Sequence, residues 1–346
     1  MARTEVQSTG RVASPPAPAR ASARPASRAD APTLSIVVAA YNEEDVLDIF
    51  FARLEETLAS LGESYEIICV NDGSRDRTAE VLAAHNARDP RIRVINLARN
   101  FGKELALTAG LDATRGRAVV PLDADLQDPP ELIGEFLRLW REGFDVVYAI
   151  RNARDTDSWM KRTTAKVFYA MLRRVSNVDI PPNAGDFRLM DARVVEALRG
   201  LRERNRFMKG LFSWVGFRQT SIGYERPLRA AGKTKFNYWK LWNFALDGIT
   251  GYSTVPLRLA TYFGFVFAVL AMVYGVYLLV RTMIWGTDVP GYASTMVAVI
   301  FMGGMQLVVL GIIGEYLGRL YSEAKQRPLY IVDSRLGFED NGDAVD

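Results

Sequence analysis

Two long uncharged runs near the C-terminus limit what this chain can fold into more than any other feature. Leu259 to Val280 is 22 residues without a charge, and Ala293 to Ile313 is 21. A helix rises 1.5 Å per residue, so each run can cross a hydrocarbon layer about 30 Å thick. Two buried helices of a large soluble protein are the alternative, but two such runs rarely occur together in soluble chains. We therefore predict two transmembrane helices within residues 258–314.

Basic residues outside these runs predict an orientation in the membrane. They are Lys233, Lys235, Lys240 and Arg258 before the first run and Arg319, Lys325 and Arg327 after the second. Residues 282–292, between the runs, contain no Lys or Arg, and Arg281 is the one opposing charge. Because cytoplasmic segments carry the excess of Lys and Arg, we expect a multi-pass protein of the inner (plasma) membrane with both termini in the cytoplasm.

The part of the chain before the runs has the pattern of an α/β domain. Residues 1–32 are rich in Ala, Pro, Arg and Ser, which predicts a disordered tail, and they lack the apolar stretch of a signal peptide. Over residues 33–230, short apolar runs alternate with amphipathic stretches. The runs interpreted as strands are Leu34 to Ala39, Tyr65 to Val70, Arg91 to Leu97, Arg117 to Leu122 and Phe144 to Ile150. This alternation predicts a mostly parallel, Rossmann-like sheet with helices on both faces.

Two further segments complete the predicted organisation. Residues 236–252, within a segment 231–257 before the first run, are rich in Phe, Tyr and Trp. We interpret them as amphipathic helices at the membrane interface, with packing against the sheet domain as the alternative. Residues 315–346 are expected to form a cytoplasmic C-terminal tail.

Composition excludes several kinds of site. The 43 basic and 40 acidic residues give a net charge of +3, too small for a global nucleic-acid-binding footprint. The single cysteine, Cys69, rules out an intrachain disulfide and is expected in the core because its neighbours are apolar. The single histidine, His85, lies in a polar helix-like stretch and is expected at the surface. A histidine-based metal site is therefore excluded.

Polar motifs follow three of the predicted strands at their carboxyl ends, where ligands bind in such sheets. The motifs are Ala39-Ala40-Tyr41-Asn42-Glu43, Asn71-Asp72-Gly73-Ser74 and Asp123-Ala124-Asp125. Asp72 can accept a hydrogen bond from a nucleobase, and Tyr41 can stack on one. Asp123 and Asp125 end a buried run and can hold a hard cation that bridges phosphate oxygens. A second such pair, in residues 155–157, is interpreted as capping or surface charge.

Together the motifs resemble the inverting family-2 glycosyltransferases of the GT-A fold, in the branch of dolichyl-phosphate mannose synthases and bacterial bactoprenol glucosyltransferases. The resemblance runs from about Leu34 to Pro328, and the two-span tail is typical of the bacterial branch. Its stretches are Val38 to Glu44, Val70 to Thr78, Arg99 to Gly110, Asp123 to Pro130, Gly185 to Asp191, Arg206-Phe207 and Gly232 to Phe236. One departure is Ala39, where many relatives have proline, but alanine keeps the close backbone approach.

The resemblance implies a reaction. One hexose moves with inversion from a nucleotide-sugar to polyprenyl (undecaprenyl) phosphate, with a Mg²⁺ or Mn²⁺ ion on the donor diphosphate. Glucose from UDP-glucose is the favoured donor, while mannose, N-acetylated sugars and aminoarabinose derivatives remain open. The implied partners are the donor, the lipid acceptor, the bilayer and further copies of the chain in a homo-tetramer.

The resemblance also implies residue roles. The nucleotide pocket would be lined by Ala39, Tyr41, Glu43, Asp72 and Asp123, and the metal held by Asp123, Asp125 and Gln127. Donor phosphates would meet Arg206 with Lys233 or Lys235, from a mobile loop. The lipid phosphate would meet Arg151 and Arg162. Asp125 and Asp186 are the catalytic candidates.

Asp186 has two interpretations. It follows a turn-rich stretch and precedes a helix-like one that continues through Val194 and Leu198. It can be the N-cap of that helix. Alternatively, its Gly-Asp-Phe-Arg frame places its carboxylate beside the reacting sugar, as a base or as a group that orients sugar or acceptor. The acceptor is a phosphate monoester with a second pKa near 6, so it needs little deprotonation at neutral pH.

Other functions fit the sequence less well. A processive polysaccharide synthase shares the Asp-x-Asp pair, but no glutamine here begins the expected Gln-x-x-Arg-Trp motif. Gly232-Lys233-Thr234 suggests a nucleotide-triphosphate hydrolase, yet the phosphate-loop pattern needs glycine where Pro227 stands. A non-enzymatic membrane scaffold fits the spans but leaves the acids at three strand ends unexplained.

Overall fold

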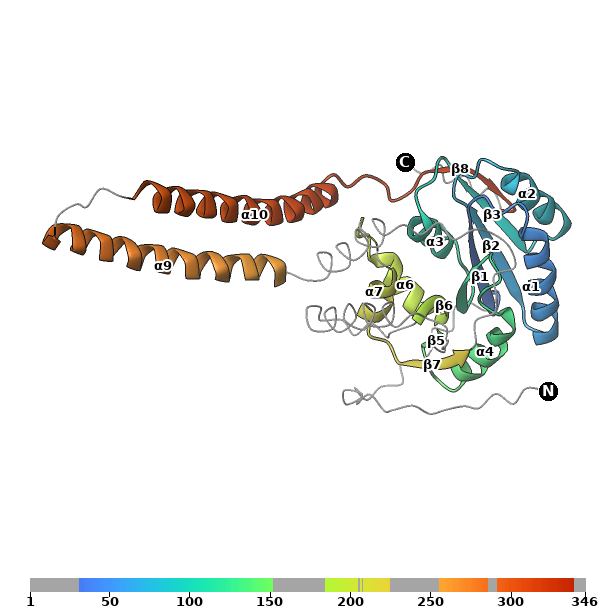
Figure 1. The fold of residues 1–346 in the computed structure, drawn as a ribbon. Helices are drawn as coiled ribbons and strands as arrows, with labels where there is room; N and C mark the ends of the chain where they lie inside the picture. The colour runs from blue at the N-terminus through green and yellow to red at the C-terminus, as the bar shows by residue number, and fades with distance from the viewer. Residues whose placement is uncertain are drawn as a thin grey trace. The chain divides into compact units, whose positions relative to one another are not determined.

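A computed structural model describes residues 31–151, 184–204, 206, 208–224, 255–285 and 291–338. These residues divide into two compact units. The first holds a sheet with its covering helices, and the second holds the two long C-terminal helices (Figure 1).

The described residues of the first unit form an eight-stranded sheet in the order β7-β5-β6-β4-β1-β2-β3-β8. The strands are β1 (Leu34–Ala40), β2 (Tyr65–Asn71), β3 (Ile92–Leu97), β4 (Ala118–Asp123), β5 (Val146–Arg151), β6 (Ala184–Asp191), β7 (Gln219–Tyr224) and β8 (Val332–Leu336). Strands β4, β1, β2 and β3 are parallel, as are β5 and β7. β6 is antiparallel to β4 and β5, and β8 to β3. This confirms the predicted mostly parallel α/β sheet.

Helices cover both faces of the sheet, because alternate residues of its strands point to opposite sides. Ile36 and Val38 pack in a cluster with α1, α2 and α4, whereas Val37 packs with α3, α6 and α7. The helices are α1 (Leu47–Leu61), α2 (Thr78–Arg88), α3 (Lys103–Asp112), η1 (Pro130–Leu132), α4 (Ile133–Arg141), α6 (Ala192–Gly200) and α7 (Met208–Trp214). Helix α3 lies against β1 so closely that a Cβ atom at Gly110 would be 2.3 Å from Val37.

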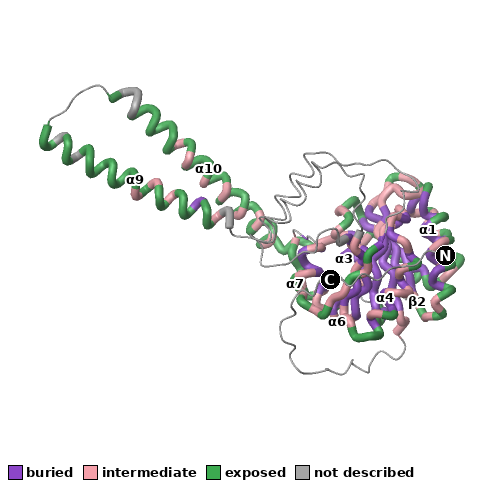
Figure 2. The backbone as a smooth tube through the Cα atoms, turned by 60° about the horizontal axis from the view of Figure 1, so that its bottom comes forward, coloured by how far each residue is buried: buried purple, intermediate pink, exposed green. Residues whose placement is uncertain are grey.

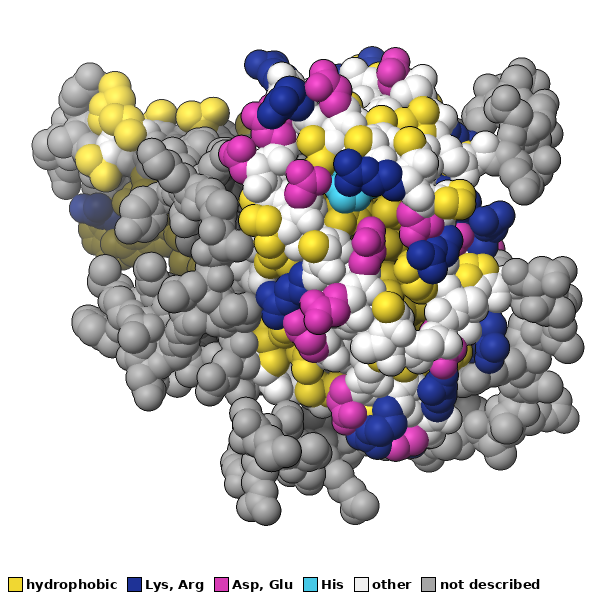
Figure 3. All heavy atoms as spheres, turned by 90° about the vertical axis from the view of Figure 1, so that its right-hand side faces the viewer, with side chains coloured by type: hydrophobic (Ala, Val, Ile, Leu, Met, Phe, Trp, Pro, Cys, Tyr) yellow, Lys and Arg dark blue, Asp and Glu magenta, His cyan; other side chains and the backbone are white. Residues whose placement is uncertain are grey.

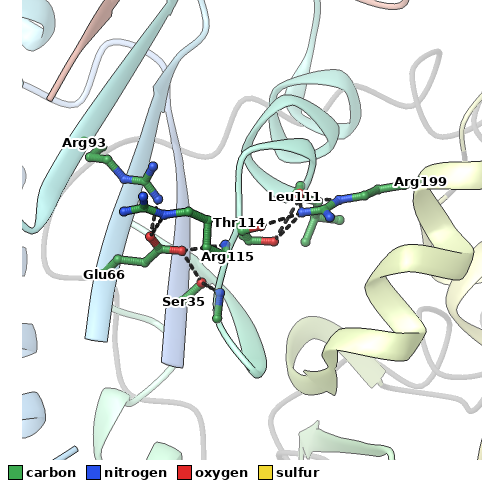
Figure 4. Close-up of polar contacts among 8 residues, drawn as sticks. Ser35, Glu66, Arg93, Leu111, Thr114, Arg115 and Arg199 are labelled. Atoms are coloured by element: carbon green, nitrogen blue, oxygen red, sulfur yellow. Dashed lines mark hydrogen bonds and ion pairs between the residues drawn. The ribbon is translucent and has the colours of Figure 1, made fainter. Parts of the chain in front are cut away.

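A buried polar network at the amino ends of the strands is structural (Figure 4). The carboxylate of Glu66 accepts hydrogen bonds from the Ser35 hydroxyl at 2.5 Å and the Arg115 main-chain nitrogen at 2.7 Å, and it pairs with Arg93. Arg199 of α6 donates to two main-chain carbonyls at and just after the end of α3, each at 2.7 Å. These contacts fix the turn between α3 and β4. The network lies at the edge opposite the polar motifs.

The second unit consists of α9 (Val255–Trp285) and α10 (Tyr292–Ala324). Each contains a stretch of mean hydropathy 2.4 that is long enough to cross a membrane, Leu257–Trp285 and Thr295–Ala324. None of the residues in these stretches' most apolar windows is buried, and Figure 2 shows both helices exposed along most of their length. Within the residues that the structure describes, these two helices are therefore not part of a buried core. The two helices pack on each other, with the rings of Phe267 and Phe301 5.5 Å apart.

The C-terminal segment differs from the predicted tail. Helix α10 continues to Ala324, and β8 then joins the edge of the sheet beside β3. Asn96 donates to the Ser334 hydroxyl at 3.0 Å, and the Tyr330 hydroxyl donates to Asp112 at 2.9 Å. Sequence patterns missed β8 because it has five residues, three of them polar and exposed, and no apolar run.

The surface position predicted for His85 is wrong. Its side chain is buried, its ring stacks on Phe51 at 4.0 Å between centroids, and a ring nitrogen lies 2.8 Å from Asp48. Only its edge reaches the face over α1 and α2, where acidic and basic side chains are mixed (Figure 3). The inward position of His85 on α2 is accommodated because Phe51 offers an aromatic surface and Asp48 a partner. Cys69 is buried, as predicted.

Candidate active site

The carboxyl ends of the central parallel strands bring the polar motifs together. In the β1–β4 pairing, Ala39 lies opposite Asp123, and in the β1–β2 pairing Ala40 lies opposite Asn71. The first, second and third motifs therefore begin side by side at one edge of the sheet. Tyr41 and Glu43, which continue the first motif, are half-buried there.

The first two motifs are tied to each other by main-chain hydrogen bonds. Asn42 has a positive φ of 54°, its main-chain nitrogen donates to the Ser74 hydroxyl at 3.1 Å, and its side chain accepts from Arg75 at 2.9 Å. Glu43 donates its main-chain nitrogen to the Thr78 hydroxyl at 2.9 Å. These contacts fix the turn that follows β1, so the half-buried side chains beside it have a rigid support.

Asp72 holds the loop that leads into α3. Its buried carboxylate accepts hydrogen bonds from the main-chain nitrogens of Phe101 at 2.7 Å and Gly102 at 2.9 Å. Burial raises the pKa of Asp72 above its usual value, and the two hydrogen bonds oppose that rise. At Gly73, where φ is +64°, a Cβ atom would lie 2.4 Å from the carbonyl carbon of Arg99. The carboxylate thus faces the loop, and contact with a nucleotide remains a prediction.

The Asp-x-Asp pair lies where β4 turns into a loop. Asp123, Asp125 and Gln127 are partly exposed, while the residues between them, Ala124 and Leu126, are buried. Leu126 has a positive φ of 56°, and the main-chain nitrogen of Gln127 donates to the Asp125 carboxylate at 3.2 Å. The three predicted metal ligands thus reach the surface of a turn whose two intervening residues are buried.

Asp186 lies beside Asp123 because β6 runs antiparallel to β4. The start of β6 is therefore at the edge where β4 ends. The capping interpretation of Asp186 is wrong: it is a strand residue, and Asp191 is the N-cap of α6, accepting from the Arg193 main-chain nitrogen at 2.9 Å. Among the described residues, the buried Oδ1 atom of Asp186 has no hydrogen-bond partner.

Lys103, the first residue of α3, joins the two acids. Its Nζ atom is 2.7 Å from Oδ2 of Asp123 and 2.8 Å from Oδ2 of Asp186. Desolvation opposes the charge of Lys103, but the two carboxylates outweigh it and raise the lysine pKa. Desolvation alone would raise the pKa of Asp186, yet Lys103 outweighs it and the pKa is lowered. At Asp123 burial prevails, and the pKa is raised. Asp186 is thus the more firmly ionised of the two acids.

A fourth acid lies behind this group. Glu104 accepts a hydrogen bond from the Met208 main-chain nitrogen at 3.3 Å. Burial, and then the charge of Asp186, raise the pKa of Glu104 to about 7. Sequence reasoning gave neither Lys103 nor Glu104 a role. A signal was present at Lys103, since a cation at a helix N-terminus opposes the helix dipole and needs a local reason.

The donor set at Asp123 and Asp125 fits a divalent cation shared with a diphosphate. Within the part of the chain that the structure describes, no three His, Cys, Asp or Glu side chains are grouped to hold a metal. Two carboxylates and the Gln127 amide are hard oxygen donors. Mg²⁺ is typically held by one or two carboxylates, with substrate phosphates and water as its other ligands.

The predicted phosphate-binding residues are only partly visible. Arg206 is buried, and its guanidinium donates to the main-chain oxygens of Leu201 at 2.6 Å and Leu198 at 3.4 Å, at the end of α6. Its contact with phosphate remains a prediction. Arg151 ends β5, which runs parallel to β4, so its backbone reaches the same edge of the sheet. The Arg151 side chain and the residues Arg162, Lys233 and Lys235 lie outside the described residues.

Comparisons with known proteins identify the family of this chain. Residues 35–199 match the model of glycosyl transferase family 2, and residues 255–320 match the GtrB C-terminal hairpin. An uncharacterized glycosyltransferase of Synechocystis sp. is 56% identical over 88% of this chain and 96% of its own length. The bactoprenol glucosyl transferase of Shigella phage SfX is 46% identical over 87% of this chain and 99% of its own.

Among solved structures, glucosyl-3-phosphoglycerate synthase from Mycobacterium tuberculosis, in complex with Mn²⁺, UDP-glucose and phosphoglyceric acid, has a TM-score of 0.42 at 21% identity. The match covers 63% of this chain and 78% of that one. The matches cover nearly the whole length of these curated relatives, and the two apolar helices of this chain match the GtrB C-terminal hairpin. The chain therefore belongs to glycosyltransferase family 2, and it carries the GtrB C-terminal hairpin.

Proposed function

We propose that this chain transfers one glucose residue from UDP-glucose to polyprenyl phosphate and forms a lipid-linked sugar. The observation that carries the proposal is the 46% identity to the bactoprenol glucosyl transferase of Shigella phage SfX over 99% of that protein. The chain also matches the GtrB C-terminal hairpin over residues 255–320. In this proposal the hairpin keeps the enzyme at the membrane, where a lipid acceptor is found. Asp123, Asp125 and Asp186, which follow or begin strands at the same edge of the sheet, would supply the acids of a site for such a transfer.

The reaction is a direct displacement at the anomeric carbon. An acceptor phosphate oxygen forms a bond to C1 of the sugar while the bond from C1 to the UDP oxygen breaks, so the configuration inverts. UDP gains the negative charge, which a divalent cation held by Asp123, Asp125 and Gln127 would neutralise. In this proposal Arg151 and Arg162 hold the acceptor phosphate, and Arg206 with Lys233 or Lys235 contacts the donor phosphates. Arginines suit this work because they bind phosphates through two parallel N–H groups.

Asp186 acts in this proposal as an orienting carboxylate rather than as a base. Lys103 holds its pKa below the usual value, whereas an effective general base has a pKa near the working pH. The acceptor phosphate, with a second pKa near 6, is already mostly ionised at neutral pH. The buried Oδ1 atom, which has no partner among the described residues, is available to accept a hydrogen bond from a sugar hydroxyl.

The membrane arrangement follows from charge. Basic residues Arg319, Lys325 and Arg327 follow the second span, and residues 282–292 between the spans have none. We infer that the sheet domain and both termini are cytoplasmic, where nucleotide-sugars are made. A homo-tetramer is the proposed assembly, and the mass of the detergent-solubilised protein would test it.

The test is a transfer assay with the full-length enzyme in lipid nanodiscs. Radiolabelled UDP-glucose with polyprenyl phosphate and Mg²⁺ or Mn²⁺ should give a lipid-extractable sugar, and excess chelator should abolish it. Asp125→Asn should lower turnover steeply while the protein stays folded, since each 1.36 kcal/mol lost from the transition state is about tenfold in rate. Product from GDP-mannose or a UDP-N-acetylhexosamine but not from UDP-glucose would overturn the donor assignment. Full turnover in excess chelator would overturn the proposed metal dependence.

A further inference from the structure

One ammonium group occupies the centre of the proposed site. Lys103 Nζ contacts Asp123 and Asp186 at 2.7 and 2.8 Å, although the lysine side chain as a whole is 47% exposed. The two carboxylates come from β4 and β6, and the lysine from the start of α3. This one cation thus holds together two acids of the site that would otherwise repel each other.

The position of Lys103 is built into the loop before α3. Asp72 accepts hydrogen bonds from the main-chain nitrogens of Phe101 and Gly102, and Gly102 has a φ of +96°. These contacts fix where α3 begins, and they therefore fix the backbone position of Lys103, its first residue. A lysine at this end of a helix is disfavoured by the helix dipole, because the helix N-terminus is itself positive. Its place is therefore explained by the acids it contacts and not by the helix it begins.

A divalent cation bound to Asp123 and the Lys103 ammonium on the same carboxylate oppose each other. A Mg²⁺ ligand lies about 2.0–2.1 Å from the ion, and the lysine nitrogen is 2.7 Å from the same carboxylate. Both cations would be close neighbours of like charge, in a partly buried site where such repulsion is weakly screened. Binding of the metal to Asp123 therefore favours departure of the ammonium from that carboxylate. Asp186 offers it a second partner to keep.

We propose that Lys103 is the internal counter-ion of Asp123 and Asp186 while no donor is bound. It gives up its contact with Asp123 when the metal arrives with the nucleotide-sugar. This rests on the metal-dependent transfer proposed above. Before the donor binds, Lys103 pairs with both Asp123 and Asp186, offsets one of their two negative charges and disfavours binding of free metal. Once the metal is on Asp123, Lys103 keeps its contact with Asp186. The N–H group that had donated to Asp123 can then donate to a phosphate oxygen of the donor. Lys103 is thus a positioning residue for the metal and for Asp186.

The test measures binding of Mn²⁺ alone to the full-length protein in detergent at pH 8, by calorimetry and by the electron paramagnetic resonance signal of free Mn²⁺. Lys103→Met should bind Mn²⁺ at least tenfold more tightly than the unchanged protein, because its competitor is gone. Lys103→Arg keeps the charge and should stay within about threefold of the unchanged protein. Lys209→Met is the matched control, because Lys209 also acts electrostatically on Asp186 but is not the residue that bridges it to Asp123. Its affinity should change by less than threefold.

The outcomes separate this proposal from the proposed reaction. If Lys103→Met binds Mn²⁺ no more tightly than the unchanged protein, or if neither binds it, Lys103 is not a competitor and the proposal fails. If Lys209→Met tightens binding as much as Lys103→Met, the effect is general charge and the proposal also fails. Glucose transfer by the unchanged enzyme is measured separately. If Lys103 competes with Mn²⁺ for Asp123 but the unchanged enzyme transfers no glucose, the proposed donor or acceptor is wrong and the role of Lys103 stands.

Discussion

The hydroxyl group of Tyr224 donates a hydrogen bond to the carboxylate of Asp128, and both side chains are buried. Tyr224 ends β7, three strands away from β4 in the sheet, whereas Asp128 lies three residues after Asp125. The loop that carries the Asp-x-Asp pair is therefore anchored from the far end of the sheet. Asp125 and Gln127 gain a fixed position from a contact that neither of them makes.

Tyr224→Phe should lower the free energy of unfolding by about 1–3 kcal/mol, because a buried carboxylate loses one donor while the ring stays in place. It should also weaken binding of UDP-glucose with Mn²⁺, since the loop around Asp125 is less fixed. Thermal unfolding and calorimetric titration measure the two effects. Tyr65→Phe, at the amino end of the interior strand β2, is the control and should leave donor binding unchanged. Unaltered stability and affinity in Tyr224→Phe would show that the loop holds itself.

Asp186 and Asp191 offer a matched pair of variants. Asp186→Asn should leave the thermal unfolding temperature nearly unchanged but lower turnover a hundredfold or more, because the neutral amide no longer presents a charged acceptor beside the sugar. Asp191→Ala should do the reverse. It removes the cap of α6, worth about 1 kcal/mol, and the acceptor of the Trp140 indole N–H at 2.8 Å, so stability falls while folded enzyme still turns over. Near-normal turnover in Asp186→Asn would contradict a role at the reacting sugar.

Much of the candidate site's placement was predictable because it depends on local sequence. A buried apolar run followed by acids predicts both a strand and its polar end, so the position of Asp123 and Asp125 at the carboxyl end of β4 was predicted from residues 118–125 alone. The helical hairpin was equally local, since length and lack of charge define it. Cys69 was placed in the core from its immediate neighbours.

What escaped prediction depends on pairings between distant segments. From the sequence, Asp186 could be interpreted as a helix cap. The antiparallel pairing of β6 with β4, which the sequence does not show, is what brings Asp186 next to Asp123. Lys103 reaches the same point from a third segment. His85 is buried because Phe51, far away in sequence, offers its ring. Each error has the same cause, a partner supplied by tertiary structure.

Glu104 predicts a pH dependence of stability. Its pKa is about 7 in the folded protein and about 4.3 when unfolded, so between these values the folded state binds more protons than the unfolded state. Stability should therefore fall as pH rises from about 4.5 to 7 and then level off. Glu104→Gln should flatten that slope, as measured by unfolding temperatures at pH 5, 6, 7 and 8.

The control for Glu104 is Glu56→Gln, at an exposed position on α1, which should keep the slope of the unchanged protein. The groups that act on Glu104 are Asp186, Lys103 and Lys209, and none of them is altered by either variant. An unchanged slope in Glu104→Gln would mean that some other group titrates in this range.

The last prediction concerns β8, the strand that follows the membrane hairpin. Ending the chain at Arg327 removes its pairing with β3, the Asn96–Ser334 and Tyr330–Asp112 hydrogen bonds, and the contacts of Val332 with the apolar cluster beneath β3. Two hydrogen bonds at about 1 kcal/mol each, together with the lost apolar contacts, should lower the unfolding temperature by about 5–10 °C. The exposed edge of β3 should also promote association between chains.

Two shorter changes test whether β8 itself causes this loss. A chain ending at Phe338 keeps β8 and should unfold like the full-length protein. A chain without residues 1–30 should do the same and keep its turnover, because that Ala-, Pro- and Arg-rich segment lacks the apolar periodicity needed for a core. Unfolding followed by tryptophan fluorescence, with size-exclusion chromatography in the same detergent, compares all four chains. If the chain ending at Arg327 unfolds at the same temperature as the one ending at Phe338, β8 contributes nothing to the sheet. The pairing of β8 with β3 would then not contribute to the stability of the sheet domain.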